Sequence, residues 1–478
     1  MSTGPGERSS PVDILLTHSN HLYYDRKQAR KMQPYPPLQT LLAAACLRER
    51  GYQVALFDAT LESPETGFEQ ALNRYQPRLV AVCEDNFNYL TKMCLLRNRE
   101  LAHWMAAAAR RRGVPAIVNS SDATDRAGDY LRAGFEYVLV GELEAVIVEV
   151  AQRLLDGYCH AEPIRSIAFL DSRTGQVCYT PRRAPISNPD TLPMPAWDLV
   201  DAEPYRQAWT AAHGYFSVNM VSSRGCPYRC NWCAKPIWGD TYHCRSAALV
   251  AREMYQVKMR FRPDHLWFAD DIFALSQQWT NEFADEVESL GAQVPFKMQS
   301  RCDLMTRPTV DALRRAGCAE VWMGVESGSQ DVLDAMDKGM RLRHVFEARE
   351  NLRRHGIHAC YFLQFGYPGE TWKEIEQTVA LVRKTQPDDI GVSVSYPLPG
   401  TAFHQMVSSQ LGPKENWADS DDLDMMFQGA YSTGFYRALA DALHLEVRTG
   451  PASASEAWAN VLALRETSAR KMPLWISC

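Results

Sequence analysis

Long apolar runs are absent from this sequence of 478 residues. Residues 1–20 are too polar for a signal peptide, and no later stretch is apolar enough to span a membrane. An excess of basic residues is also missing, because 51 Lys and Arg stand against 57 Asp and Glu. We therefore expect a cytoplasmic protein with no membrane or nucleic-acid partner.

Internal repeats and low-complexity segments are missing as well, and an apolar share of 46% is ordinary for a globular protein. The length is sufficient for two or three domains. The 13 cysteines are an odd number and are scattered along the chain. In a reducing compartment this pattern favours free thiols and metal ligands over disulfides.

Short apolar runs alternate with helical patterns in the first third of the chain. The alternation predicts an α/β domain over residues 1–156, built on a doubly wound parallel sheet. Ligands bind such sheets at the carboxyl ends of the strands, and small polar residues follow the strands here. The expected strands are VDILLTH (12–18), QVALFDA (53–59), RLVAVCED (78–85), PAIVNSS (115–121) and YVLVGE (137–142).

A second βα series occupies residues 216–401. Six strands are too few for a closed eight-stranded barrel but enough for an open, partial (βα)6 barrel. We expect residues 157–215 to form a linker with a small hairpin, and residues 402–478 to form a mainly helical C-terminal cap. The expected barrel strands are YFSVNMVSSRG (215–225), HLWFA (265–269), VPFKMQS (294–300), AEVWMGVE (319–326), HACYFLQFG (358–366) and IGVSVSYP (390–397).

Three cysteines gather in the stretch RGCPYRCNWC (224–233), directly after the first barrel strand. Four thiolates would complete an ordinary electron-transfer cluster, whereas Cys226, Cys230 and Cys233 leave one iron of a 4Fe–4S cluster without a protein ligand. An open iron can bind a substrate. The alternative is a structural zinc site in which Cys244 or His243 is the fourth ligand.

The Cys-x3-Cys-x2-Cys spacing, with Trp232 before the last cysteine, resembles the signature of the radical S-adenosylmethionine (SAM) superfamily. Further stretches resemble, in order, the strand motifs of the subgroup that includes the anaerobic protoporphyrin cyclase. The resemblance covers residues 217–401. These stretches are LWFADDIF (266–273), VWMGVESGSQDVLDAMDKG (321–339), FGYPGET (365–371) and YPLPGT (396–401).

This resemblance implies a 4Fe–4S cluster on the three cysteines and SAM chelated to the open iron. It further implies an external electron donor of flavodoxin or ferredoxin type, and cleavage of SAM to a 5′-deoxyadenosyl radical. Contacts to SAM are implied for Gln299, Glu326, Ser327 and Gln364. Glu326 has a compatible structural interpretation, as a carboxylate at a helix N-terminus.

The N-terminal domain resembles the cobalamin-binding domain that usually precedes the radical core in this subgroup. The likeness lies in residues 35–59 and 122–146. The motif Asp-x-His-x-x-Gly, which supplies a histidine to the lower face of cobalt in many cobalamin proteins, is absent. The lower face of the cobalt is therefore either empty or bound by another ligand, or the domain has lost cobalamin. Each expected contact has a turn or cap role as its alternative. The expected cobalamin contacts are Glu84, Asn86, Ser120, Ser121, Thr124 and Gly141.

Taken together, the motifs favour a methyltransferase that acts on an unactivated carbon of a small molecule or natural product. The alternative is a radical cyclisation or rearrangement that uses cobalamin differently. A methylthiotransferase is disfavoured because the first strand ends in THSN (17–20) without a cysteine, and a non-catalytic cobalamin or cluster sensor is disfavoured by the complete series of core motifs. Residues 416–447 resemble the tail of the same subgroup. Met425, Met426 and Phe427 are expected there to be core, with the lining of a substrate chamber as the alternative. No catalytic residue is assigned.

Overall fold

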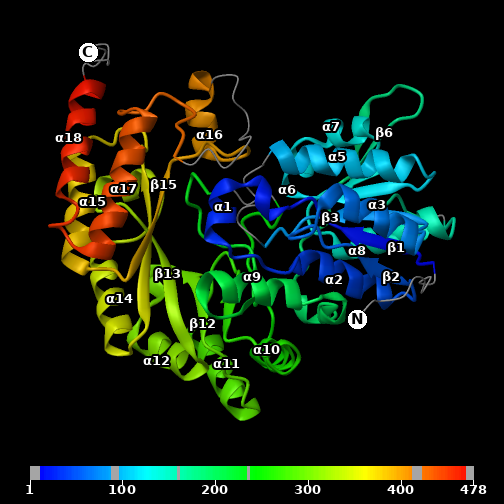
Figure 1. Cartoon of the computed structure of the whole chain (residues 1–478), viewed down its shortest axis with the longest axis horizontal. Coiled ribbons are helices and arrows are strands. Elements are labelled where there is room, and N and C mark those ends of the chain that lie inside the picture. Colours follow the sequence, from blue (N-terminus) through cyan, green and yellow to red (C-terminus); the bar gives the residue numbers. More distant parts are fainter. Residues whose placement is uncertain (1–10, 88–95, 159–161, 234–236, 412–422, 470–478) are drawn as a thin grey trace.

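The N-terminal part of the chain is a doubly wound sheet, as predicted. Five parallel strands lie in the order β2-β1-β3-β4-β5 (Figure 1). In sheets of this order ligands bind where the strand order reverses, between β1 and β3. The strands are β1 (Ile14–Thr17), β2 (Val54–Leu56), β3 (Leu79–Cys83), β4 (Ala116–Asn119) and β5 (Tyr137–Leu139). The computed structural model describes residues 11–87, 96–158, 162–233, 237–411 and 423–469.

The expected hairpin forms from β6 (Ile167–Leu170) and β7 (Val177–Tyr179). It does not stand apart in the linker, because β6 also pairs antiparallel with β5 and makes a seven-stranded sheet. An edge strand exposes unpaired N–H and C=O groups, and β6 satisfies those of β5. The N-terminal sheet therefore continues past residue 156, where we expected the domain to end.

Helices cover both faces of this sheet because successive side chains of its strands point to opposite sides. Leu15 of β1 belongs to the core beneath α3 and α5, whereas Ile14 and Leu16 belong to the core beneath α2 and α8. The N-terminal helices are η1 (Leu22–Tyr24), α1 (Arg26–Lys31), α2 (Leu38–Arg48), α3 (Pro64–Tyr75), α5 (Leu96–Arg110), α6 (Ser121–Asp125), α7 (Ala127–Ala133) and α8 (Glu144–Leu155).

The second βα series is a six-stranded parallel sheet in the order β8-β11-β12-β13-β14-β15. Among the described residues β8 and β15 do not pair, so the barrel is open, as predicted. Met298 and Phe365 face the helices in the core, and alternation places Gln299 and Gln364 on the inner face. The strands are β8 (Ser217–Met220), β11 (His265–Phe268), β12 (Phe296–Ser300), β13 (Cys318–Glu326), β14 (His358–Phe365) and β15 (Asp389–Val394).

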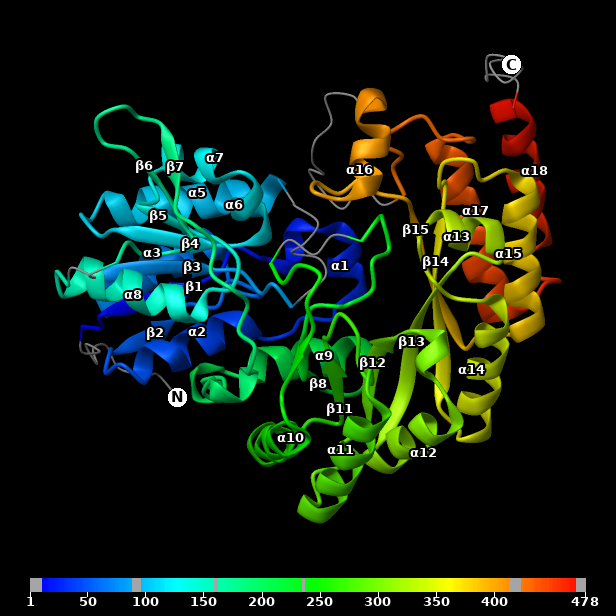
Figure 2. The same cartoon turned by 180° about the vertical axis from the view of Figure 1, so that it is seen from behind.

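The outer face of the barrel is covered by helices that follow the strands in the chain (Figure 2). A capping box between Thr371 and Glu374 begins α15. The barrel helices are α10 (Ala247–Phe261), α11 (Gln277–Leu290), η4 (Cys302–Leu304), α12 (Arg307–Ala316), α13 (Gln330–Ala335), α14 (Leu342–Arg354) and α15 (Trp372–Thr385).

The tail packs against β15 and α15 and is helical, although α17 begins later than the sequence suggested. Ser432 caps α17, and residues 423–432 before it are not helical; residues 412–422 lie outside the described part. Phe427 belongs to an apolar cluster, and the partly buried Met425 and Met426 pack against the apolar clusters. The remaining helices are η2 (Pro189–Thr191), η3 (Trp197–Leu199), α9 (Glu203–His213), α16 (Ala402–Val407), η5 (Ser408–Gln410), α17 (Thr433–Thr449) and α18 (Ser455–Ala469).

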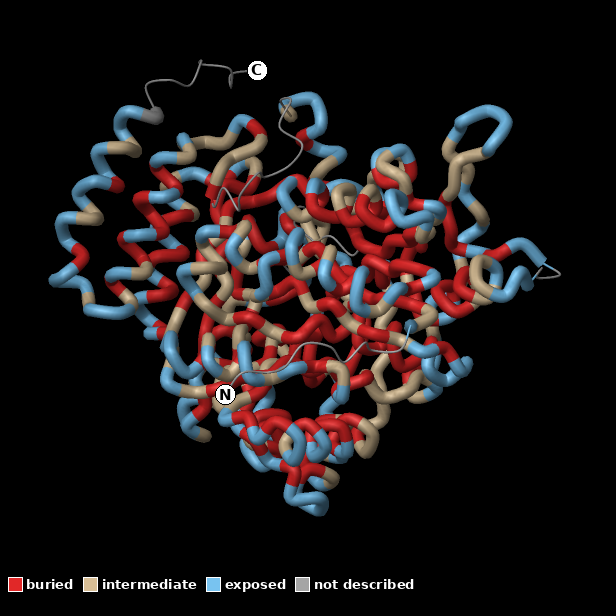
Figure 3. The backbone as a smooth tube through the Cα atoms, turned by 45° about the vertical axis from the view of Figure 1, so that its right-hand side comes forward, coloured by how far each residue is buried: buried red, intermediate tan, exposed pale blue. Residues whose placement is uncertain are grey.

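Buried residues run through both halves of the molecule and across the junction between them (Figure 3). The junction is formed partly by the segment before α2. The Trp209 indole donates to the Pro34 carbonyl at 2.6 Å, and the Asn219 amide donates to the Pro36 carbonyl at 3.1 Å. No helix in the described ranges is both long and apolar enough to cross a membrane.

Candidate functional site

The three predicted ligand cysteines lie together on one loop at the carboxyl end of the first barrel strand. We call residues 226–233 the cluster loop. It follows β9 (Ser223–Arg224), which pairs antiparallel with β10 (His243–Cys244). Cys226, Cys230 and Cys233 are half-buried and form no disulfide.

The base of the cluster loop is held by a buried carboxyl group of the barrel. Asp270, which follows β11, accepts hydrogen bonds from the Ser222 hydroxyl at 2.6 Å and from the Ser223 hydroxyl. Burial raises the pKa of Asp270 to about 6, although these hydrogen bonds lower it in part. The start of the loop is therefore fixed to the second barrel strand.

Gly225 is required where the backbone turns into the cluster loop. Its φ is +75°, and an added Cβ would lie 2.2 Å from the Thr241 carbonyl oxygen. We expect Gly225→Ala to retain less than half of the wild-type iron after reconstitution, because the loop must move to relieve this contact. Gly239→Ala is the matched control, since Gly239 has a similar φ of +65° but open space around it. Equal iron contents in the two variants would contradict the prediction.

The far end of the cluster loop packs on the barrel. The Asn231 backbone N–H donates to the Met336 carbonyl at 3.1 Å, and the Tyr367 hydroxyl donates to the Asn231 side-chain oxygen at 3.1 Å. Trp232 packs against the apolar cluster that contains Tyr367 and Phe403. Its indole nitrogen is buried and has no hydrogen-bond partner among the described residues. A polar ligand beside the loop would satisfy it.

Two buried cations face the cluster loop. Arg301, directly after β12, lies 3.7 Å above the centroid of the Tyr228 ring and donates to the Lys338 carbonyl at 2.9 Å. The Lys338 ammonium is paired with the Glu326 carboxylate at 2.7 Å. Burial alone would lower the pKa of Lys338, but Glu326 and the Cys230 thiolate raise it above its ordinary value.

The residues predicted to contact SAM lie at the carboxyl ends of three neighbouring barrel strands. Gln299 is half-buried on β12, Glu326 ends β13, and Gln364 on β14 donates to the Ser395 hydroxyl at 2.9 Å. Ser327 is buried and bonds the Thr378 hydroxyl at 3.2 Å. The Glu326 carboxylate is paired with a lysine rather than with a helix N-terminus. The contacts to SAM themselves stay predictions.

Cys244 and the cluster cysteines have different surroundings. The Cys244 thiol donates to the Ser222 carbonyl at 3.5 Å, and burial raises its pKa to about 12, so the protonated form is favoured. No three His, Cys, Asp or Glu side chains of the described residues come close enough to share one metal ion. A 4Fe–4S cluster does not need that closeness, because each thiolate binds a different iron.

At the edge of the N-terminal sheet, three of the expected cobalamin contacts lie near one another. Glu84 accepts from the Ser19 backbone N–H at 2.7 Å, which joins the ends of β3 and β1 at the switch point. The Asn86 amide donates to Asn119 at 2.8 Å, and Asn119 donates to the Gly141 carbonyl at 3.0 Å. The Asn86 side-chain oxygen is buried without a partner among the described residues. This edge fits a group that donates a hydrogen bond.

The other three expected contacts are on α6 or at its start. Ser120 is the N-cap of α6 and accepts from the Ala123 N–H at 2.8 Å, and the Thr124 hydroxyl donates to the Ser120 carbonyl at 2.9 Å. Ser121 is the first residue of this helix and is buried. These capping roles are the alternative that the sequence left open, and contacts to cobalamin stay predictions.

Sequence reasoning missed Lys338, Arg301 and Arg224. Arg224 is buried and pairs with Glu144 at 2.6 Å and with Glu142 at 3.2 Å, both from the N-terminal domain. A buried cation leaves no periodic pattern in a sequence. Arg224 and Lys338 lie inside stretches that resemble radical SAM motifs, which was the only available signal, and Arg301 lies outside all of these stretches.

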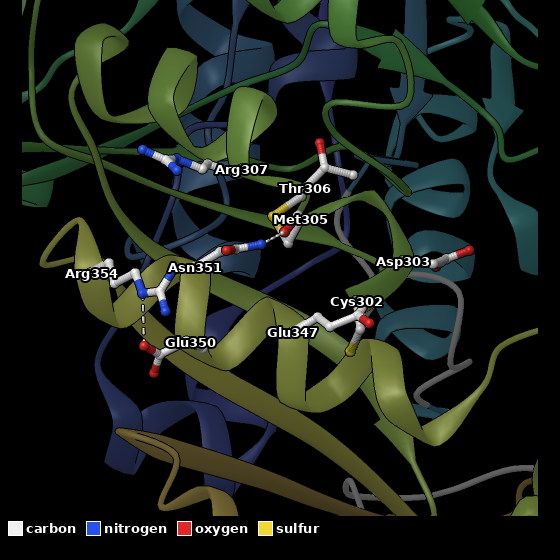
Figure 4. A pocket seen from close by; sticks show the side chains of 9 residues that line it. All are labelled: Cys302, Asp303, Met305, Thr306, Arg307, Glu347, Glu350, Asn351 and Arg354. Atoms are coloured by element: carbon white, nitrogen blue, oxygen red, sulfur yellow. Dashed lines mark hydrogen bonds and ion pairs between the residues drawn. The ribbon is translucent and has the colours of Figure 1, made fainter.

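A surface cavity of about 380 Å³ lies near η4 but outside the predicted site (Figure 4). It is bordered by η4, the start of α12 and α14. The Asn351 amide donates to the Met305 carbonyl at 2.9 Å, and Arg354 pairs with Glu350 at 2.7 Å. Both acidic and basic side chains line it, and it contains none of the predicted site residues.

The fold and the cluster loop define a radical SAM domain preceded by a doubly wound domain. Residues 220–382, from the end of β8 into α15, match the model of the Radical SAM superfamily. The chain therefore contains a radical SAM domain, as the resemblance implied.

Several curated relatives carry the word methyltransferase in their names. The uncharacterized methyltransferase PH0819 of Pyrococcus horikoshii is 26% identical over 60% of this chain. The bacteriochlorophyllide d C-12(1)-methyltransferase of Chlorobaculum tepidum is 22% identical over 63% of this chain. The matches span 61% and 66% of these relatives, which is less than two thirds of their length.

Among solved structures, the whole arrangement is similar to TsrM of Kitasatospora setae, a radical SAM methyltransferase solved with cobalamin and a [4Fe–4S] cluster. The TM-score is 0.68 at 18% identity, and the match covers 84% of this chain and 76% of TsrM. This chain therefore shares its fold with a radical SAM methyltransferase whose structure contains bound cobalamin.

Proposed function

We propose that this protein is a cobalamin-dependent radical SAM methyltransferase that methylates an unactivated carbon of a small molecule. The observation that carries the proposal is the joining of two sites in one chain: a three-cysteine loop beside two buried cations, and a doubly wound sheet with a polar switch point. The methyltransferase names of the relatives and the fold of TsrM support methylation over the other radical chemistries.

The cluster loop and the carboxyl ends of β12 to β14 would form the radical-generating half of the site. Cys226, Cys230 and Cys233 would hold the 4Fe–4S cluster, which when bound supplies the electron that cleaves SAM. Lys338 and Glu326 would offer a cation and a carboxylate for the charged methionyl end of SAM. The half-buried cluster loop would receive electrons from a flavodoxin- or ferredoxin-type donor.

The edge of the N-terminal sheet would hold cobalamin through Glu84, Asn86 and Gly141. Cobalamin when bound supplies a carrier for the methyl group. His18 and His21 follow β1, but both rings are buried and held by the end of the second strand: His18 bonds Asp58 at 3.0 Å, and His21 bonds the Ala59 carbonyl at 2.8 Å. We therefore propose that no histidine of the chain coordinates the lower face of cobalt.

Electron paramagnetic resonance of the Co(II) form tests this arrangement. We expect the purified, anaerobically reconstituted protein to bind cobalamin and to give cobalt lines without the triplet splitting that an axial nitrogen causes. A triplet would contradict the empty lower face and would indicate an axial nitrogen, from a histidine or from the base of cobalamin itself. Failure to bind cobalamin at all would overturn the function proposed for the N-terminal domain, and the methylation proposal with it.

A further inference from the structure

A buried ion-pair network joins the two proposed cofactor sites. Arg224 lies two residues before Cys226, and its guanidinium donates to Glu144 at 2.6 Å and to Glu142 at 3.2 Å. Both carboxylates belong to the segment that follows β5, next to Gly141. The Arg224 side chain is 5% exposed and that of Glu144 is 1% exposed. The start of the cluster loop is thus paired with the edge of the N-terminal sheet.

Glu144 is the stronger of the two partners. Burial alone would raise its pKa, but the Arg224 guanidinium lowers it below the ordinary value. For Glu142 burial prevails over the same cation, and the pKa is raised. The Gln39 amide also donates to Glu144 at 2.9 Å. The ion pair of Arg224 and Glu144 is therefore the principal contact.

Two aromatic rings flank the same guanidinium. The Arg224 carbon Cζ lies 5.6 Å from the centroid of the Phe87 ring and 5.0 Å from that of Trp238, and the two rings stack at 5.2 Å. Phe87 directly follows Asn86 in the loop after β3. One short loop therefore carries expected cobalamin contacts at one end and a contact to Arg224 at the other.

We propose that Arg224 is a positioning residue that couples the two cofactor sites. A cluster bound to the cluster loop then strengthens cobalamin binding, and bound cobalamin strengthens the binding of the cluster. The inference rests on the proposed function, because it assumes cobalamin at the N-terminal edge. The physical basis is that the Arg224 guanidinium must stay paired with Glu144 in the interior, since an unpaired buried charge is costly. A shift of the cluster loop therefore shifts the segment that follows β5.

Coupling of this kind is reciprocal and is measured as a ratio of affinities. The experiment is an anaerobic titration of the full-length protein with hydroxocobalamin, with and without the reconstituted cluster. We expect the wild type to bind cobalamin about 5-fold or more tightly when the cluster is present, the lower end of typical coupling. Glu144→Gln should reduce this ratio to about 1, because a neutral amide does not hold the guanidinium as an ion pair.

The matched control is Asp198→Asn, which neutralises the partner of another arginine, Arg48, at an exposed ion pair. It should keep the wild-type ratio. Arg224→Lys is the second variant, because a compact ammonium does not replace a planar guanidinium that pairs with two carboxylates and stacks on rings. It should also lower the ratio while the cluster signal persists, which would show that a folded protein has lost the coupling.

Three results would overturn the inference while leaving the proposed function intact. These are a wild-type ratio of 1, an unchanged ratio in Glu144→Gln, and an equal loss in Asp198→Asn. Absence of cobalamin binding in the wild type under both conditions would overturn the proposed function itself, so the two failures are distinguishable.

Discussion

Replacing any one of Cys226, Cys230 and Cys233 with Ala is expected to abolish the iron–sulfur cluster. In a 4Fe–4S cluster held by three cysteines, three of the four irons each have one protein ligand. The loss of one cysteine therefore leaves two irons without a protein ligand. The wild-type protein should hold about four irons and four sulfides after anaerobic reconstitution, the content of one cubane. Iron and sulfide analysis, together with the absorption of the cluster, measures the effect.

Cys244→Ala is the control for these variants. The Cys244 thiol is half-buried, hydrogen bonded to the Ser222 carbonyl and held in a strand pair, so we expect wild-type iron content without it. Loss of the cluster in Cys244→Ala, with retention in one of the other three variants, would contradict the ligand assignment. One bound zinc per chain in place of iron would favour the structural zinc site.

Lys338→Met is expected to have the second largest effect. The variant leaves the Glu326 carboxylate buried without its cation, and breaking a buried ion pair in this way costs about 3–5 kcal/mol. Removal of the positive charge next to Cys230 should also lower the reduction potential of the cluster, because that potential depends on net charge and hydrogen bonding. Denaturant unfolding measures the stability, and a redox titration measures the potential.

Glu326→Gln separates the roles of the pair. It should keep the cluster and weaken the binding or cleavage of SAM, and unchanged binding and cleavage would assign Glu326 a structural role only. The double variant Lys338→Met/Glu326→Gln should recover part of the stability lost in Lys338→Met, because no buried charge is left uncompensated. A double variant as unstable as the sum of the two single variants would contradict the pairing.

Most strands were predictable from the sequence because buried parallel strands are short apolar runs with helical patterns between them. The five parallel strands of the N-terminal sheet and four of the six barrel strands lie within the expected stretches, and β13 and β15 each begin one residue earlier than expected. The antiparallel pairing of β6 with β5 was not predictable, because the hairpin sequence does not say which edge it joins. Residues 423–432 lie in the tail that was expected to be mainly helical, but they form irregular chain, with Met425 beside Gly366.

The cluster cysteines were predictable because their spacing is local, whereas the charged groups around them depend on tertiary contacts. Lys338 pairs with Glu326, which is 12 residues away in the sequence, and Arg224 pairs with Glu144, which is 80 residues away. Neither pair leaves a local pattern. Ser120 and Thr124 are the opposite case. Their position at the end of a strand predicted contacts to a ligand, but local hydrogen bonds at the start of α6 already engage their side chains.

The most direct measurement of the central claim is the product balance of an anaerobic turnover. The reconstituted protein, loaded with cobalamin and given a reductant and SAM with a deuterated methyl group, is incubated with a panel of candidate metabolites and analysed by mass spectrometry. We predict S-adenosylhomocysteine and 5′-deoxyadenosine in comparable amounts and a product that carries the deuterated methyl group on carbon. Formation of 5′-deoxyadenosine without stoichiometric S-adenosylhomocysteine, and with an unlabelled product, would contradict methylation and indicate a radical cyclisation or rearrangement.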